Sequence, residues 1–172
     1  AAQQLVDDAS FPFGTIYPLV YRDGKYASGR PAVRPDKRVQ WIYDFTIARL
    51  EEEAPATLFL TTNEHLRVQF RKNYWKTTDQ FGQTPIRLRW AGRLINFRPP
   101  ILVAPNEKGP ASVYAIKNVG ALGNLSAPFG LFTSGQLHRL DWNGVGMMSA
   151  WQTELSGYGA GMAVVTPAPG SA

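Results

Sequence analysis

The sequence predicts an all-β protein, a single jelly-roll (Greek-key) β-sandwich or barrel. Short stretches in which apolar and polar residues alternate recur along almost all of the 172 residues, as in half-buried strands. Gly and Pro, 16 and 13 in number, punctuate these stretches at intervals of roughly eight to fifteen residues. Long loops between hairpins favour a Greek key over a simple meander. An immunoglobulin-like wiring of the same strands stays open.

The N-terminal part begins with an aromatic and β-branched run, residues 14–21, which Pro18 interrupts as in an edge or bulged strand. Residues 22–36, rich in Gly and Pro, predict a long loop. The clearest strand covers residues 39–47, because every second residue is apolar. Its predicted apolar face consists of Val39, Trp41, Tyr43, Phe45 and Ile47.

The next segments alternate between buried and amphipathic patterns. Residues 48–54 predict one helical turn before Pro55, and residues 57–61 predict a buried strand. Residues 66–71 alternate between apolar side chains and Arg or Gln, which predicts a strand with one core face and one basic face. Residues 73–85 predict a polar loop.

Residues 86–90 and 93–97 alternate in the same way around Ala91-Gly92, which predicts a hairpin. A loop-rich stretch of small residues covers 120–135. The remaining strand candidates are residues 101–104, 112–117, 136–142, 145–151 and 159–165.

The length fits one domain over residues 1–172, with flexible terminal arms at residues 1–10 and 166–172. The chain has no Cys, so it can form neither a disulfide nor a thiolate metal site. Residues 1–10 have neither a basic nor an apolar region of the kind a signal peptide needs, so no signal peptide is expected.

Residue types that carry chemistry are sparse. The two histidines, His65 and His138, lie far apart in the chain without a nearby cluster of acids, so we expect ordinary surface or loop residues. The contiguous acids at 51–53 lack the alternate spacing of a cation loop, and no serine fits a nucleophile elbow. The sequence therefore predicts no catalytic, metal-binding or cofactor-binding residues, no cofactor and no enzymatic activity.

The net charge is +5, and the basic residues concentrate before residue 99. If the strands that carry them are neighbours, their outward side chains form a guanidinium-rich sheet face. That face could be solvated with cross-strand ion pairs, could bind phosphate of nucleic acid or lipid, or could contact an acidic subunit. The residues of this candidate interface are Arg67, Arg71, Arg87, Arg89, Arg93 and Arg98.

Two groups of aromatic residues differ in their surroundings. Trp41, Trp90 and Trp142 fall within alternating patterns and are expected in the core. Tyr74 and Trp75 are flanked by polar and basic residues, which fits a sugar-stacking surface, a membrane interface or an interface anchor as well as plain packing. We add this pair to the candidate interface.

The absence of Cys, the use of Arg and Pro, and the stretches FPFGTIYPLVYRDGKY and IRLRWAGRLINFRPPILVAPN together carry a resemblance over the whole chain. It resembles the small single jelly-roll major capsid proteins of tailless icosahedral Thermus bacteriophages that enclose an internal membrane. The resemblance implies a non-enzymatic, thermophilic structural protein located in the virion shell and made in the host cytoplasm. Its implied partners are further copies of itself, as a homodimer or larger lattice, and a second, larger capsid protein. Anionic headgroups of the membrane are a further partner, and no specific nucleic acid is expected.

Two other functions remain open at this stage. A carbohydrate-binding β-sandwich would use Tyr74 and Trp75 as a stacking platform. A basic β-barrel that binds single-stranded nucleic acid would show an affinity that falls steeply with salt.

Overall fold

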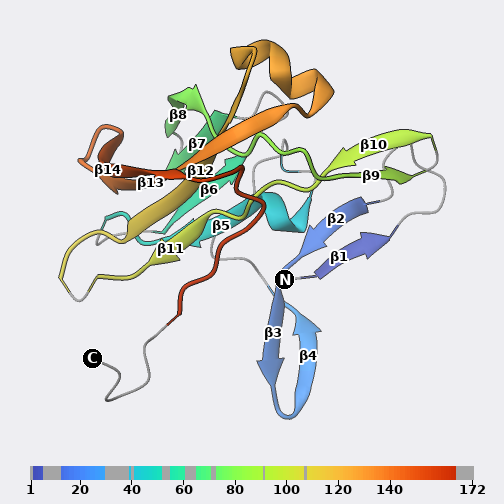
Figure 1. Cartoon of the computed structure of the whole chain (residues 1–172). Coiled ribbons are helices and arrows are strands. Elements are labelled where there is room, and N and C mark those ends of the chain that lie inside the picture. Colours follow the sequence, from blue (N-terminus) through green and yellow to red (C-terminus); the bar gives the residue numbers. More distant parts are fainter. Residues whose placement is uncertain are drawn as a thin grey trace.

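The computed structural model describes residues 2–5, 13–29, 39, 41–51, 55–60, 65–70, 73–90, 92–106 and 108–165. In these residues the protein consists of antiparallel β-sheets and two short 3₁₀ helices (Figure 1). The prediction of an all-β protein is therefore confirmed, and the arrangement is consistent with a β-sandwich.

Two four-stranded sheets form the body of the molecule. The first contains β5 (Phe45–Ala48), β6 (Ala56–Leu60), β7 (His65–Phe70) and β8 (Asn73–Gln80) in that order. The second contains β11 (Leu102–Ala104), β12 (Ser112–Gly120), β13 (Phe132–Trp142) and β14 (Met147–Leu155). Each sheet joins strands in chain order, so its described connections are those of a meander. The jelly-roll wiring is not confirmed.

Three two-stranded hairpins accompany the body. They pair β1 (Ala2–Leu5) with β2 (Phe13–Tyr17), β3 (Leu19–Arg22) with β4 (Lys25–Ser28), and β9 (Arg87–Trp90) with β10 (Arg93–Asn96). Figure 1 shows β3–β4 and β9–β10 extending away from the two larger sheets. The 3₁₀ helix η1 (Ile42–Asp44) precedes β5, and η2 (Gly123–Phe129) connects β12 to β13.

The main core contains apolar residues from both sheets, because alternate side chains of a strand point to the same face. Leu58 of β6 and Val113 of β12 are fully buried in it. Thr57 and Phe59, which point to the other face of β6, are fully buried as well. Both faces of β6 are therefore covered, which explains why its sequence is apolar without strict alternation.

The prediction of a strand over residues 39–47 is largely wrong. Residues 42–44 form η1, and the strand begins only at Phe45. The helical turn breaks the alternation, so Tyr43 and Ile47 are exposed rather than in the core. Asp44, expected on the polar face, is buried, and its Oδ2 accepts a hydrogen bond of 2.7 Å from Nη1 of Arg98. Val39 and Trp41 of the predicted apolar face are buried as expected.

Two predicted loops contain strands. Within residues 73–85, β8 pairs with β7 from Asn73 to Gln80, so polar composition here marks an edge strand. Within residues 22–36, β4 pairs with β3 through a turn at Asp23 and Gly24, both of which have positive φ angles. An Asp-Gly pair between strand-forming residues is a strong hairpin signal, and it was missed.

The expected last strand, residues 159–165, is also wrong, because residues 158–165 belong to no strand. The Asn118 side chain binds the start of this segment instead. Its Nδ2 donates to the carbonyl oxygen of Gly159 at 2.9 Å, and its Oδ1 accepts from the Gly159 amide at 2.7 Å. Nδ2 also donates to the carbonyl oxygen of Gln83 at 2.6 Å. A side chain thus supplies the hydrogen bonds that a neighbouring strand would have made.

Other predictions agree with the structure. The hairpin at residues 86–97 is β9–β10, the buried strand at 57–61 is β6, and Pro18 separates β2 from β3. Of the predicted terminal arms, residues 2–5 form β1. Residues 6–10 and 166–172 lie outside the described residues, as do residues 52–54 of the predicted helical turn.

Candidate assembly surfaces

The connection through η2 carries a group of exposed apolar side chains. No charged residue occurs between Asn118 and His138. The exposed side chains, called the η2 patch below, are Leu122, Leu125, Phe129 and Leu131, with exposed fractions of 61%, 70%, 71% and 56%. Exposed apolar clusters of this kind mark interaction surfaces in soluble proteins.

The sequence of η2 explains why these side chains point outward. Ser126 is fully buried, and its Oγ accepts a hydrogen bond of 2.9 Å from the amide of Leu122. A Cβ added at Gly120 would overlap Ser126, so the glycine lets the helix lie directly against β12. The small inward residue holds the helix close, and the large apolar residues remain outside.

Arg87 links the η2 patch to the β9–β10 hairpin. Its guanidinium donates hydrogen bonds to the carbonyl oxygens of Pro128, at 2.9 Å, and Ala127. These carbonyls lie at the end of η2, where the partial negative charge of the helix favours a cation. Gly130, with a φ of 68°, ends the helix there in the left-handed conformation that favours glycine. Arg87 therefore has an internal partner.

The β9–β10 hairpin exposes further apolar side chains. Leu88, Trp90 and Leu94 are exposed by 42%, 48% and 56%. The prediction that Trp90 lies in the core is therefore wrong, although Ile95 of the same hairpin is buried. Arg89 of β9 lies opposite Leu94 of β10 in the strand register, and its side chain is also exposed. The hairpin thus combines exposed apolar side chains with an exposed positive charge.

The β3–β4 hairpin presents two exposed tyrosines. Tyr21 and Tyr26 are directly opposite in the register, and their ring centroids lie 5.0 Å apart. They are exposed by 63% and 73%. Rigid aromatic pairs of this kind are common interface anchors.

The other predicted interface arginines do not share one surface. Arg67 is half-buried in β7 and lies opposite Lys76 of β8 in the strand register. Arg98 forms the ion pair with Asp44. Because β7 and β9 belong to different sheets, their arginines do not form one sheet face. Arg71 and the side chain of Arg93 lie outside the described residues.

Tyr74 and Trp75 are neighbours in β8, and successive side chains of a strand point to opposite faces. Trp75 packs against the main core, whereas Tyr74 is 52% exposed. A Cβ added at Gly146 would lie 2.6 Å from Nε1 of Trp75, so the indole is covered on that side as well. The two rings therefore do not form one stacking platform.

His138, expected at the surface, is buried, so that prediction is wrong. Its ring lies 5.1 Å from Phe81 in an edge-to-face contact, and its Nε2 is 3.3 Å from Oε1 of Gln136. Burial lowers the pKa of His138, and the positive charge of Lys117 lowers it further. The carboxylates of Asp79 and Glu154 offset part of this lowering of the pKa, and the ring packs beside Phe81. Alternation along β13 indicates an inward position, because Leu140 faces the core two residues later.

Within the described residues, no group of three or more His, Asp or Glu side chains is placed to hold a metal ion. None of the helices in this part of the chain is long and apolar enough to cross a bilayer. No match was found when the chain was compared with protein-family models, with curated proteins and with solved structures.

Proposed function

We propose that this chain is a structural virion protein, a major capsid subunit. In this proposal it assembles an icosahedral shell with further copies of itself and with a larger jelly-roll partner, over an internal membrane. The jelly-roll wiring is part of the same proposal and stays a prediction. The observation that supports assembly is the exposed apolar surface of the η2 patch and the hairpins.

The composition of these surfaces fits subunit contacts. Interface centres contain few charges and are enriched in aromatic residues. The η2 patch lies in a stretch without charged residues, and the hairpins add Trp90, Tyr21 and Tyr26. Leaving this apolar area in water costs free energy that burial against a neighbour recovers. A shell subunit needs such surfaces on several sides of a stiff body.

Arg89 supplies the charged component of the proposed contacts. It is exposed on β9, whereas Arg87 and Arg98 have internal partners. An exposed guanidinium beside apolar side chains can pair with a carboxylate of a neighbouring subunit or with an anionic lipid headgroup. We assign the contact with acidic partners to Arg89.

The mass of the purified protein, measured by light scattering across concentration and salt, tests the proposal. We expect the wild type to form dimers or larger particles. The Leu125→Ser/Phe129→Ser variant should remain a monomer at concentrations where the wild type associates, with an unchanged circular dichroism spectrum, because both side chains are exposed. Val145→Ser is the matched control, because Val145 is 82% exposed but lies outside the patch.

Arg89→Glu should weaken association in the same experiment and make it less sensitive to salt. A wild type that stays monomeric at every concentration, alone and with its larger partner protein, would contradict the proposed function. If the Leu125→Ser/Phe129→Ser variant associates as strongly as the wild type, the η2 patch takes no part in the proposed subunit contacts.

A further inference from the structure

The strand β14 forms one edge of the second sheet. Among the described residues it pairs only with β13, so the backbone N–H and C=O groups of alternate residues point away from the sheet. The side chains of residues 148–154 are all exposed. An exposed edge strand of this kind is a template to which a further strand can add.

The other edges of the two larger sheets have features that discourage pairing. β5 and β11 are only four and three residues long, and β11 lies between Pro100 and Pro105. β8 contains Lys76 and Asp79, and its register with β7 is irregular. Short length, proline, charge and irregular pairing are the usual means by which proteins protect an edge. β14, by contrast, has nine residues with no proline and one charged side chain, Glu154.

A bulge divides β14 into two parts. Leu140 of β13 lies opposite Ser149 and Arg139 lies opposite Trp151, which leaves Ala150 as the extra residue. From residue 151 to residue 155 the pairing with β13 is regular. This segment, with the sequence WQTEL, is therefore the part of the edge that a further strand can follow.

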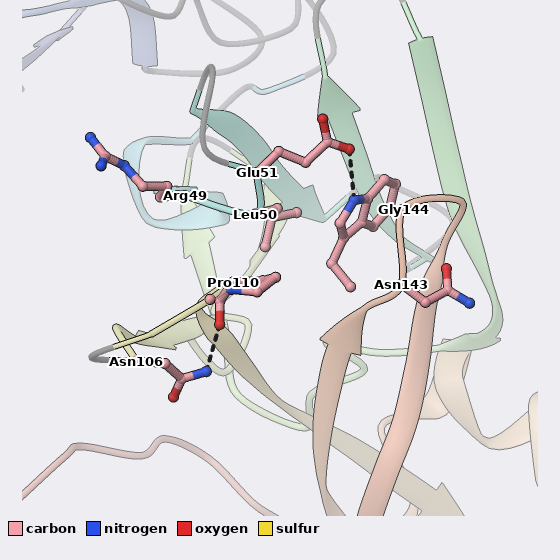
Figure 2. Close-up of a pocket in the computed structure, with 9 residues that line it drawn as sticks. Arg49, Leu50, Glu51, Asn106, Pro110, Asn143 and Gly144 are labelled. Atoms are coloured by element: carbon pink, nitrogen blue, oxygen red, sulfur yellow. Dashed lines mark hydrogen bonds between the residues drawn. The ribbon is translucent and has the colours of Figure 1, made fainter.

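The hairpin that contains β14 is fixed to the body at its turn. Nε1 of Trp142 donates a hydrogen bond of 3.0 Å to Oε1 of Glu51, and Asn143 and Gly144 follow in the turn (Figure 2). Met147, the first residue of β14, is buried in the main core. A strand that is already ordered loses less conformational entropy when it pairs with a neighbour.

The sequence of residues 151–155 is complementary to itself in an antiparallel pair. With Thr153 at the centre, Trp151 lies opposite Leu155 of a second copy. Gln152 then lies opposite Glu154, and Thr153 lies opposite its own copy. An aromatic residue facing an aliphatic one, an amide donor facing a carboxylate, and two facing threonines all stabilise antiparallel strands.

Other registers are less favourable. A pair centred on Glu154 would place two carboxylates opposite each other, and a pair centred on Gln152 would place Trp151 opposite Thr153. In the register centred on Thr153, Oε1 of Glu154 keeps its hydrogen bond of 2.7 Å from Nε2 of Gln136. Its Oε2 can then accept from the amide of the neighbouring Gln152.

We infer that β14 pairs antiparallel with β14 of a second copy about a twofold axis at Thr153, so that the second sheets of two subunits become one continuous sheet. Such a contact uses the same residues of both copies. The inference rests on the proposed association of this chain with further copies of itself. Pairing over so short a segment is weak alone, so it forms within the particles that the η2 patch also stabilises.

The test is disulfide cross-linking, which the absence of Cys from the chain makes specific. Thr153→Cys is oxidised at a concentration where the wild type associates, and covalent dimers are measured on a non-reducing gel. Residues directly opposite each other lie within reach of a disulfide. Thr153→Cys should therefore give about tenfold more covalent dimer than a thiol outside the contact, because pairing raises the effective concentration of the two thiols.

A second pair of variants tests the register. Gln152→Cys and Glu154→Cys should each give little covalent dimer alone, because each residue is displaced diagonally from its own copy, by about 7–8 Å. An equimolar mixture of the two variants should cross-link, because residue 152 of one copy lies opposite residue 154 of the other. Val145→Cys is the matched control for random collisions, since Val145 is 82% exposed and precedes β14.

The inference is overturned if Thr153→Cys gives no more covalent dimer than Val145→Cys. It is also overturned if the mixture of Gln152→Cys and Glu154→Cys cross-links no better than either variant alone. A wild type that associates in light scattering while Thr153→Cys fails to cross-link would overturn this inference and leave the proposed function intact. A wild type that stays monomeric at every concentration, alone and with its larger partner protein, would contradict both.

Discussion

The two-sheet body and the projecting elements use similar alternating sequences with opposite results. In β6 every side chain is buried, because the strand is covered on both faces. In β9 the residues Leu88, Arg89 and Trp90 are all exposed, because its only strand neighbour in the described residues is β10. The difference teaches that alternation specifies a strand but not its burial. Burial depends on how many layers surround the strand.

The comparison also assigns different roles to the two regions. The main core of the body buries apolar residues of both larger sheets within one chain, although β14 exposes Met148 and Trp151. The η2 patch and the hairpins keep several large apolar residues at the surface, where a neighbouring molecule could bury them. Substitutions in the two regions should therefore affect different measurements.

The largest contrast is expected between Leu58→Ala in the body and Leu94→Ala in the β9–β10 hairpin. Leu58 is fully buried in the main core, so its truncation should lower the free energy of unfolding by about 2–5 kcal/mol. Leu94 is 56% exposed, and its truncation should change that free energy by less than about 0.5 kcal/mol. Urea denaturation of dilute protein measures both. If both variants lose a similar free energy of unfolding, the two-sheet body and the β9–β10 hairpin do not differ in the way proposed.

A second test addresses the ion pair of Asp44 and Arg98, which joins the body to the end of the hairpin. Burial raises the pKa of Asp44 from 3.8 to about 6, and the charge of Arg98 offsets part of the rise. The folded protein therefore binds the proton more tightly than the unfolded chain. The stability that this proton supplies is complete below about pH 4 and is lost as the pH rises through about 6.

The control for this test is Asp44→Asn, which cannot titrate. The free energy of unfolding of the wild type, relative to Asp44→Asn, should fall by up to about 3 kcal/mol between about pH 4 and pH 7. Denaturant unfolding across this range measures the difference. A difference in the free energy of unfolding that rises with pH would mean that the charge of Arg98 lowers the pKa of Asp44 by more than burial raises it.

The smallest effect is expected from Arg87→Gln, which removes the charge-assisted hydrogen bonds to η2. The amides of Gly130 and Leu131 bond to η2 carbonyls, and their hydrogen exchange should accelerate about tenfold as this region opens locally. Exchange of the Val113 and Leu140 amides in the body should not change. Arg89→Gln serves as the control. Faster exchange throughout the body would show that η2 is not an independent unit.

The sequence was informative where local pattern decides structure. The β9–β10 hairpin followed from alternation around Ala91-Gly92, and the burial of β6 followed from its apolar run. The strand predicted over residues 39–47 is interrupted by η1, where Asp44 bonds to Arg98, 54 positions away. The strand predicted at 159–165 failed because Asn118, a distant side chain, binds that segment. Neither interaction leaves a local signal.

The candidate surfaces show the same limit. The absence of charge between Asn118 and His138 was visible in the sequence, and it covers the η2 patch. The proposed face of arginines depended on strand order, which hydropathy does not specify. The sheets separate Arg67 from Arg87, and internal partners engage Arg87 and Arg98. The sequence shows which residues are charged, but only the strand order shows which of them lie on the same surface.

The amide of Asn118 has a consequence for the order of folding. Its three hydrogen bonds reach residues 35 and 41 positions away, at Gln83 after β8 and at Gly159 after β14. Contacts that close such long loops form late, since their entropic cost is recovered only when the intervening strands are in place. This junction can close only after the last strand of each sheet has been added. We therefore expect this junction to close late in the folding of the chain.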